Sequence, residues 1–219
     1  MMKFSAMTLG GLLFCAMSVW AEDLPRTLFE MAGAKSEAGK LSNSVLVIVD
    51  AQREYVDGAL PLVGVDAAIA EISQLLARAR KSGTPVIHVV HKGKGALFNP
   101  ASTGFEIVAA LQPLANEIVI EKMRVSSFAG TGLEEAIQRA GRKNLIVVGF
   151  MTHNCVSSTA RAARDLGYDV TIVASATATR DLPGGNGGVI PAATLQAASL
   201  AALEDRTGAV VSFERDILE

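Results

Sequence analysis

Short apolar runs recur along the chain from residue 45 onward, and they predict buried β-strands. Runs of this kind that are unbroken by polar residues are typical of strands covered on both faces, as in a parallel sheet. The first run reads VLVIVD and ends on an aspartate. The predicted strands cover residues 45–50, 85–90, 117–120, 144–149 and 169–174, with a shorter sixth at 209–211.

Segments with helical periodicity separate these runs. In residues 65–80 the apolar positions fall three or four apart, as on one face of a helix. Similar patterns cover 133–140, 156–166 and 191–203, and the last opens on a proline, a residue favoured in the first helical turn. Regular alternation of strands and helices predicts an α/β fold, a three-layer α/β/α sandwich with a mainly parallel, six-stranded, Rossmann-like sheet.

The first residues have the pattern of a secretory signal. Lys3 precedes an apolar stretch at 7–20, which ends in a small-residue cleavage pattern at Ala21. The apolar core is shorter than the roughly 20 residues that a membrane anchor needs, so a signal peptide is the better interpretation. We therefore expect a signal peptide at 1–21 and a mature chain in the periplasm or the medium. The polar, irregular segment 22–42 predicts an N-terminal arm before a single domain at 43–219.

Composition narrows the function classes. Half of the residues are hydrophobic and 19% are charged, which argues against disorder. The formal net charge is -2 and no basic cluster interleaved with aromatics occurs, so nucleic-acid binding is not expected. Loss of Cys15 with the signal would leave Cys155 as the single cysteine of the mature chain, which rules out a disulfide framework. After cleavage we expect no membrane association.

Three chemically distinctive residues follow separate predicted strands. They are Asp50 in VDAQREY, Lys122 in IEKMRVSSF and Cys155 in GFMTHNCVSSTARAA. Each has an ordinary explanation taken alone: a turn cap, a solvated lysine and a buried structural thiol. Parallel strands end at the same edge of a sheet, however, and ligands bind at that edge. The coincidence predicts that the three side chains meet.

Physical chemistry gives each residue a task. A helix that starts near Cys155, together with the charge of Lys122, is expected to favour the thiolate. Asp50 can take the thiol proton and later deliver it to a leaving group, while Lys122 holds the two anions in register. Backbone N–H groups at the turn before the cysteine could stabilise an oxyanion. Acyl transfer to sulfur followed by hydrolysis uses these parts.

These motifs resemble those of the isochorismatase-like cysteine hydrolases. The resemblance implies the parallel six-stranded fold, a catalytic triad of Asp50, Lys122 and Cys155, and a non-proline cis peptide at Phe150–Met151. It also implies an oxyanion hole formed by the N–H groups of Met151 and Cys155, and assembly into dimers or tetramers. The segments that carry it are LVIVDAQ at 46–52, VIEKMRVSSF at 119–128 and VVGFMTHNCVSSTARAARDLGYDV at 147–170.

The pattern of histidines does not predict a metal centre. Members of that family that resemble nicotinamidases carry an Asp-x-His pair with a further histidine, and this sequence has no Asp-x-His. His88 and His91 are three apart, so on a regular strand they point to opposite faces. Zinc needs three or four converging ligands, and we expect no metal and no cofactor.

The substrate remains open at this level. A retained Cys155 favours hydrolysis of an amide or ureido C–N bond in a small molecule. Two alternatives are a vinyl-ether hydrolase of isochorismatase type with Asp50 as general acid, and a non-catalytic small-molecule binding protein. A thiol redox protein ranks last because the mature chain lacks a second cysteine.

Candidates for the substrate pocket flank the motifs. Tyr55 and Phe128 could form an apolar wall, although aromatics at such positions also serve plain packing. His91 ends the second predicted strand and could touch the substrate. The segments 93–105 and 183–188 (PGGNGG) could close over the site, and flexible surface connection is the simpler explanation of both.

Overall fold

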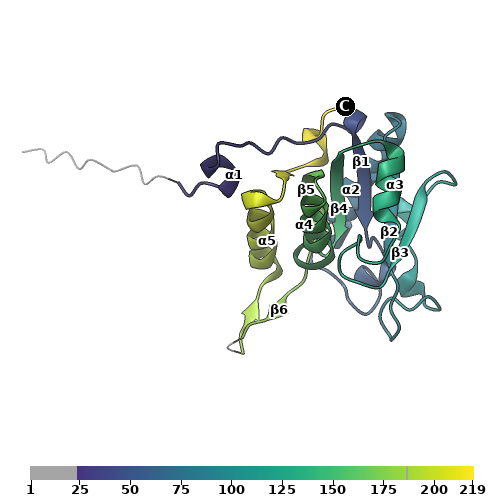
Figure 1. Ribbon diagram of the computed structural model, residues 1–219. Coiled ribbons are helices and arrows are strands. Elements are labelled where there is room, and N and C mark those ends of the chain that lie inside the picture. The colour runs from purple at the N-terminus through teal and green to yellow at the C-terminus, as the bar shows by residue number, and fades with distance from the viewer. Residues whose placement is uncertain (1–23, 186) are drawn as a thin grey trace, which may run out of the picture.

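The computed structural model describes residues 24–185 and 187–219, and it is built around one parallel sheet (Figure 1). The predicted signal peptide lies outside the described residues. The six strands run in the order β3-β2-β1-β4-β5-β8 and every neighbouring pair is parallel, which confirms the predicted fold. The strands are β1 (Ser44–Val49), β2 (Val86–His91), β3 (Ile118–Lys122), β4 (Asn144–Phe150), β5 (Asp169–Ala178) and β8 (Ala209–Val211).

Helices cover the two faces of the sheet as separate layers. The helix α2 packs on one face, and α3, α4 and α5 lie on the other (Figure 1). A small antiparallel hairpin of β6 (Leu182–Pro183) and β7 (Val189–Ile190) follows β5. The α-helices are α1 (Leu28–Met31), α2 (Val65–Lys81), α3 (Leu133–Ala140), α4 (Ser157–Asp165) and α5 (Ala192–Arg206).

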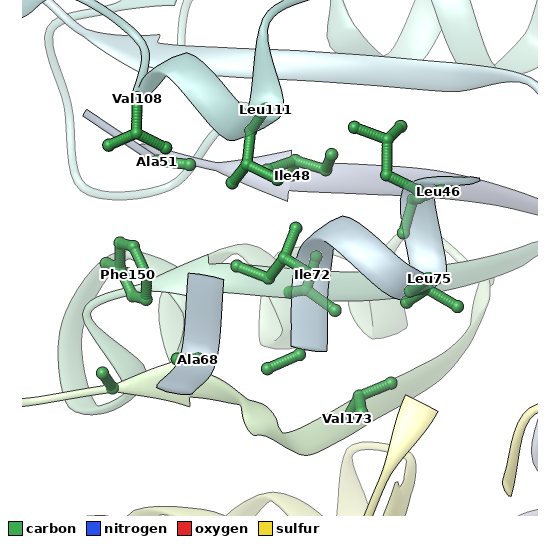
Figure 2. Close-up of a cluster of buried hydrophobic side chains, with 14 of the residues drawn as sticks. Leu46, Ile48, Ala51, Ala68, Ile72, Leu75, Val108, Leu111, Phe150 and Val173 are labelled. Carbon is green, nitrogen blue, oxygen red and sulfur yellow. The ribbon is translucent and has the colours of Figure 1, made fainter. Parts of the chain in front are cut away.

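The central strand β1 shows why an unbroken apolar run suits this position. Leu46 and Ile48 face α2, as the close-up of that cluster shows (Figure 2). Val45 and Val47 belong to the cluster on the opposite face, against α3 and α4. All four are at most 1% exposed, and burying one such side chain contributes roughly 1.5–3 kcal/mol. Alternate residues of one strand therefore anchor both helical layers.

The edge strand β3 departs from this pattern. Ile118 and Val119 are 39% and 46% exposed, so the prediction of two covered faces was wrong for this strand. The reason lies in the connection from β2, which contains only the 3-10 turns Thr103–Phe105 and Ala109–Leu111 and supplies no α-helix to cover it. The end of the strand is nevertheless enclosed, because Lys122 is buried.

The strands β1 and β4 approach so closely at Gly149 that no side chain fits there. This glycine has φ +108°, and a Cβ built on it would lie 2.0 Å from the carbonyl oxygen of Val49. We expect Gly149→Ala to lower the free energy of unfolding by about 3 kcal/mol or more, measured by urea denaturation. The matched control is Gly141→Ala: Gly141 also has positive φ, +66°, but no neighbour within 4 Å. The control should lose only about 1 kcal/mol, and equal losses in the two variants would contradict the clash.

Two further features concern the helices. In α5 only Ala192 and Leu203 are buried, so most of this alanine-rich helix is not part of the core, and assembly into dimers or tetramers stays a prediction. None of the helices in the described ranges combines the length and apolar character that crossing a bilayer requires. Residues 24–43, the described part of the chain before β1, are irregular apart from the single turn of α1 and a 3-10 turn at Leu41–Asn43.

Candidate active site

The structure brings the three distinctive residues together at the carboxyl edge of the sheet. Asp50 follows β1, Lys122 is the last residue of β3, and Cys155 follows β4. Lys122 Nζ lies 2.7 Å from Asp50 Oδ2 and 3.3 Å from Cys155 Sγ. Asp50 is 0%, Lys122 1% and Cys155 4% exposed, so all three are withdrawn from bulk water. The expected meeting is observed, while the catalytic roles stay predictions.

The strand order explains how a lysine at the sheet edge reaches the centre. Lys122 is paired in register with His91 on β2, and β2 separates β3 from β1. The lysine side chain passes this strand end and places its ammonium beside Asp50. Its other contacts are His91 Nδ1 and the carbonyl oxygen of Arg124, each at 3.2 Å. The ammonium is thus held by four partners, in a position that a shorter side chain would not reach.

Cys155 is positioned by an irregular turn. The peptide Phe150–Met151 is cis, as the family resemblance implies. A π-helical turn, Thr152–Val156, then leads into α4, and the N–H groups of Asn154 and Val156 both donate to the carbonyl of Met151. Cys155 in this turn and Met151 directly before it are both buried. Their N–H groups remain the predicted oxyanion hole.

Burial dominates the protonation of the site. It raises the pKa of Asp50 from its ordinary 3.8 to about 6, with Lys122 opposing the shift. Burial also raises the pKa of the Cys155 thiol to about 12, and the neighbouring Asp50 carboxylate adds to the rise. The predicted thiolate is therefore wrong for the free protein: loss of water and a nearby anion outweigh Lys122 and the start of the helix. At neutral pH the site holds a thiol beside a carboxylate that can accept its proton.

Two of the three predicted pocket residues flank this site. The ring of Phe98 lies edge-on to both Tyr55 and His91, with centroids 5.0 and 5.2 Å apart. The Tyr55 ring also lies edge-on to Phe150, the last residue of β4, with centroids 5.9 Å apart. Burial raises the pKa of Tyr55, and Asp50 and Cys155 raise it further. Burial and the charge of Lys122 lower the pKa of His91. Because an ammonium can only donate, His91 Nδ1 accepts from Lys122, and the neutral ring carries its proton on Nε2.

Phe128, the third predicted pocket residue, packs against a different group of side chains. Its ring stacks on Tyr168 at 6.2 Å, and it packs against the core cluster of α3 and α4. That cluster also contains Cys155. The contact of Phe128 with substrate stays a prediction.

Sequence reasoning missed two residues that build the site. Gln52 is buried; its amide donates to the carbonyls of His91 and Phe105 and accepts from the His91 N–H, so it ties the end of β1 to that of β2. Its signal was present in the motif LVIVDAQ, where only Asp50 was assigned a role. Phe98 is buried with φ 52° in the segment 93–105, and no local pattern could have identified it.

Comparison with known proteins identifies the family to which this chain belongs. The profile of the isochorismatase domain matches residues 44–215. The chain belongs to the isochorismatase family. The "secreted isochorismatase effector" of Verticillium dahliae is 38% identical over 184 residues, which are 83% of this chain and 94% of that protein. A crystal structure of an isochorismatase from Pseudomonas putida KT2440 is 43% identical with a TM-score of 0.85, and the match covers 89% of this chain and 100% of that one.

A further relative names a reaction. The ureidoacrylate amidohydrolase of Acinetobacter baylyi is 29% identical over 174 residues, covering 62% of this chain and 71% of that protein. This isochorismatase-family hydrolase is thus similar in sequence to an enzyme named as an amidohydrolase. The buried Asp50–Lys122–Cys155 arrangement is consistent with the family triad.

Two of the three histidines of this family member have partners outside the Asp50–Lys122–Cys155 group. His88 Nε2 lies 3.0 Å from Glu117 Oε2, and His153 Nδ1 contacts Thr179 Oγ1. Within residues 24–185 and 187–219, no group of three or more His, Cys, Asp or Glu side chains is arranged to hold a metal ion. The two segments predicted to close over the site are the connection after β2 that carries Phe98 and the connection between β6 and β7, of which residue 186 is not described. Their closure stays a prediction.

Proposed function

We propose that this protein hydrolyses a C–N bond of a small amide or ureido compound through a thioester on Cys155. The observation that carries the proposal is the buried ammonium of Lys122, which contacts both the Asp50 carboxylate and the Cys155 sulfur. A buried ion pair beside a thiol is costly to maintain and is typical of a catalytic site. The relative named an amidohydrolase supports the same bond type.

The steps follow from the protonation of the free protein. Asp50 accepts the thiol proton as Cys155 Sγ attacks the substrate carbonyl carbon, and a tetrahedral oxyanion forms. The positive charge of Lys122 compensates the negative charge that persists during this transfer. Asp50 then returns the proton to the leaving nitrogen as the C–N bond breaks and a thioester remains. Asp50 next takes a proton from water, which attacks the thioester, and the thiol regains that proton when the acid product leaves.

The role of Asp50 sets the pH dependence. The carboxyl must be ionised to accept the thiol proton, and its pKa is raised to about 6. We expect kcat/KM to rise with pH through an apparent pKa near this value, measured as ammonia release from a panel of small amides and ureido acids. Asp50→Asn should show no such limb and almost no activity. A rate that is flat from pH 5 to 7 would contradict the role of Asp50 as base.

Vinyl-ether hydrolysis is the second candidate, and the same carboxyl favours it. A pKa of about 6 also suits a general acid, and the fungal relative is named an isochorismatase. In that reaction protonated Asp50 would donate to the enol ether, so the rate would fall as pH rises through about 6. The thiol would be dispensable. The sign of the pH limb and the activity of Cys155→Ala therefore separate the two reactions.

We propose that the protein acts outside the cytoplasm. The basic residue, apolar core and small-residue ending of the first 21 residues support this, together with the relative named a secreted effector. We expect N-terminal sequencing of exported protein to read Glu22 as the first residue. Recovery of the chain with intact Met1 from the cytoplasmic fraction would contradict the proposal.

A further inference from the structure

We propose that Glu54 is a positioning residue: its buried carboxylate clamps the segment 93–105 against the active site and thereby sets how tightly the substrate binds. Glu54 lies four residues after Asp50, in the 3-10 turn Arg53–Tyr55 that follows β1. Its side chain takes no step in the proposed reaction. Only the kinetic test of this role rests on the proposed function.

The carboxylate of Glu54 is buried without a cation. Glu54 is 3% exposed, and it forms no ion pair with any of the described residues. Its oxygens instead accept backbone N–H groups from two separate segments: Oε1 accepts from Ala59 at 2.8 Å, and Oε2 accepts from Phe98 at 3.1 Å. Burying a charge is costly unless it is paired and hydrogen-bonded, and here the hydrogen bonds come from the backbone alone. A charged acceptor shared by two loops indicates a clamp.

The tip of the segment, residues 94–104, depends on this carboxylate. Within the described residues, the hydrogen bond from the Phe98 N–H to Glu54 is the one that ties the tip to a distant part of the chain, and its other hydrogen bonds are local. Phe98 and Gly104 are the only buried residues of the tip, and both meet the carboxylate. A Cβ built on Gly104 would lie 2.3 Å from Glu54 Oε2.

Phe98 carries the effect of the clamp to the active site. Its ring packs edge-on against His91, which accepts a hydrogen bond from the ammonium of Lys122. Phe98 also has φ 52°, a conformation that bulky residues rarely adopt and that persists only where the surroundings enforce it. Glu54 binds the N–H of this residue, and the Gly93 N–H donates to its carbonyl at 2.9 Å. Loss of Glu54 therefore releases Phe98 from that conformation and the tip from the site.

Two substitutions break the clamp from opposite sides. Glu54→Met keeps an unbranched side chain and removes both acceptors. Gly104→Ala leaves Glu54 in place, but its added methyl group would displace Oε2, the oxygen that holds Phe98. The matched control is Glu71→Met: Glu71 also accepts two hydrogen bonds, from a serine hydroxyl of β5 and from a backbone N–H. It joins α2 to β5, which lies on the opposite side of β1 from β2.

Amide hydrogen exchange tests the clamp without any substrate. The exchange rates of the Phe98 and Gly93 amides are measured by NMR, with the amides of β1 as the reference for global unfolding. We expect Glu54→Met to raise both rates on the order of tenfold or more relative to the β1 amides, and Gly104→Ala to raise them in the same direction. Glu71→Met should leave both relative rates unchanged. Relative rates equal to those of the wild type in both clamp variants would overturn the clamp.

Steady-state kinetics tests the consequence for substrate binding. If substrate binds only when the tip is closed, the apparent affinity falls with the closed fraction, whereas the bound enzyme reacts normally. We expect Glu54→Met to raise KM on the order of tenfold and to change kcat less than about threefold. A fall in kcat with unchanged KM, or no change in either, would overturn the role in binding. A wild type that cleaves no amide or ureido compound would contradict the proposed function instead, and the exchange rates would still decide the clamp.

Discussion

Replacing Cys155 with alanine is expected to lower kcat for C–N hydrolysis on the order of 10⁴-fold or more, because it removes the atom that forms the thioester. KM should change far less, since the sulfur contributes little to binding of the ground state. Steady-state kinetics on any amide that the wild type cleaves measures both values. Circular dichroism and thermal unfolding show whether the fold is retained.

Cys155→Ser is the informative companion variant. It replaces the thiol with a hydroxyl of similar volume. A serine hydroxyl is a far weaker acid than the thiol, so Asp50, with a pKa of about 6, is a poor base for it. We expect the serine variant to be nearly as inactive as the alanine variant. More than a tenth of wild-type activity in Cys155→Ala would contradict covalent catalysis by this residue.

The second large effect is expected for Lys122→Met, which keeps an unbranched side chain one atom shorter than lysine and removes its charge. Removing one partner of a buried ion pair typically costs about 3–5 kcal/mol, because the other charge stays buried without compensation. We expect a loss of this size in the free energy of unfolding, measured in urea at neutral pH. The pKa of Asp50 should rise further without its ammonium, so the carboxyl would be protonated at neutral pH and activity would be lost.

A double variant separates electrostatics from packing. In Asp50→Asn with Lys122→Met both charges are absent, so the protein should regain part of the stability that Lys122→Met loses, while remaining inactive. Two results would show that the buried ion pair does not contribute the expected stability. One is a free energy of unfolding of Lys122→Met close to that of the wild type. The other is a loss in the double variant equal to the sum of the losses in the two single variants.

The sequence was sufficient to predict the sheet and the meeting of the three distinctive residues, because both follow from where the strands lie and end. Apolar runs located the strands, and parallel strands end at one edge, so Asp50, Lys122 and Cys155 could be expected to meet. The lysine could be assigned without knowing that β3 is an edge strand. The prediction that both faces of β3 are covered was wrong, because the helix that an α/β unit normally supplies between β2 and β3 is absent.

The protonation of the thiol could not be read from the sequence. Motif and helix position both favoured a thiolate, but the outcome depends on how far Cys155 is removed from water and on the carboxylate beside it. The contribution of Phe98 likewise depends on tertiary structure. Phe98 reaches the site from the long connection after β2.

The central claim, a covalent intermediate on Cys155, is tested most directly by the mass of the Cys155 peptide during turnover. Wild-type protein is mixed with an amide that it cleaves, quenched in acid at successive times and digested. Covalent catalysis predicts a peptide heavier by the acyl group of the substrate, present in the wild type before the steady state ends and missing from Cys155→Ala. An unmodified Cys155 peptide at every quench time, while ammonia is released at the full rate, would contradict it.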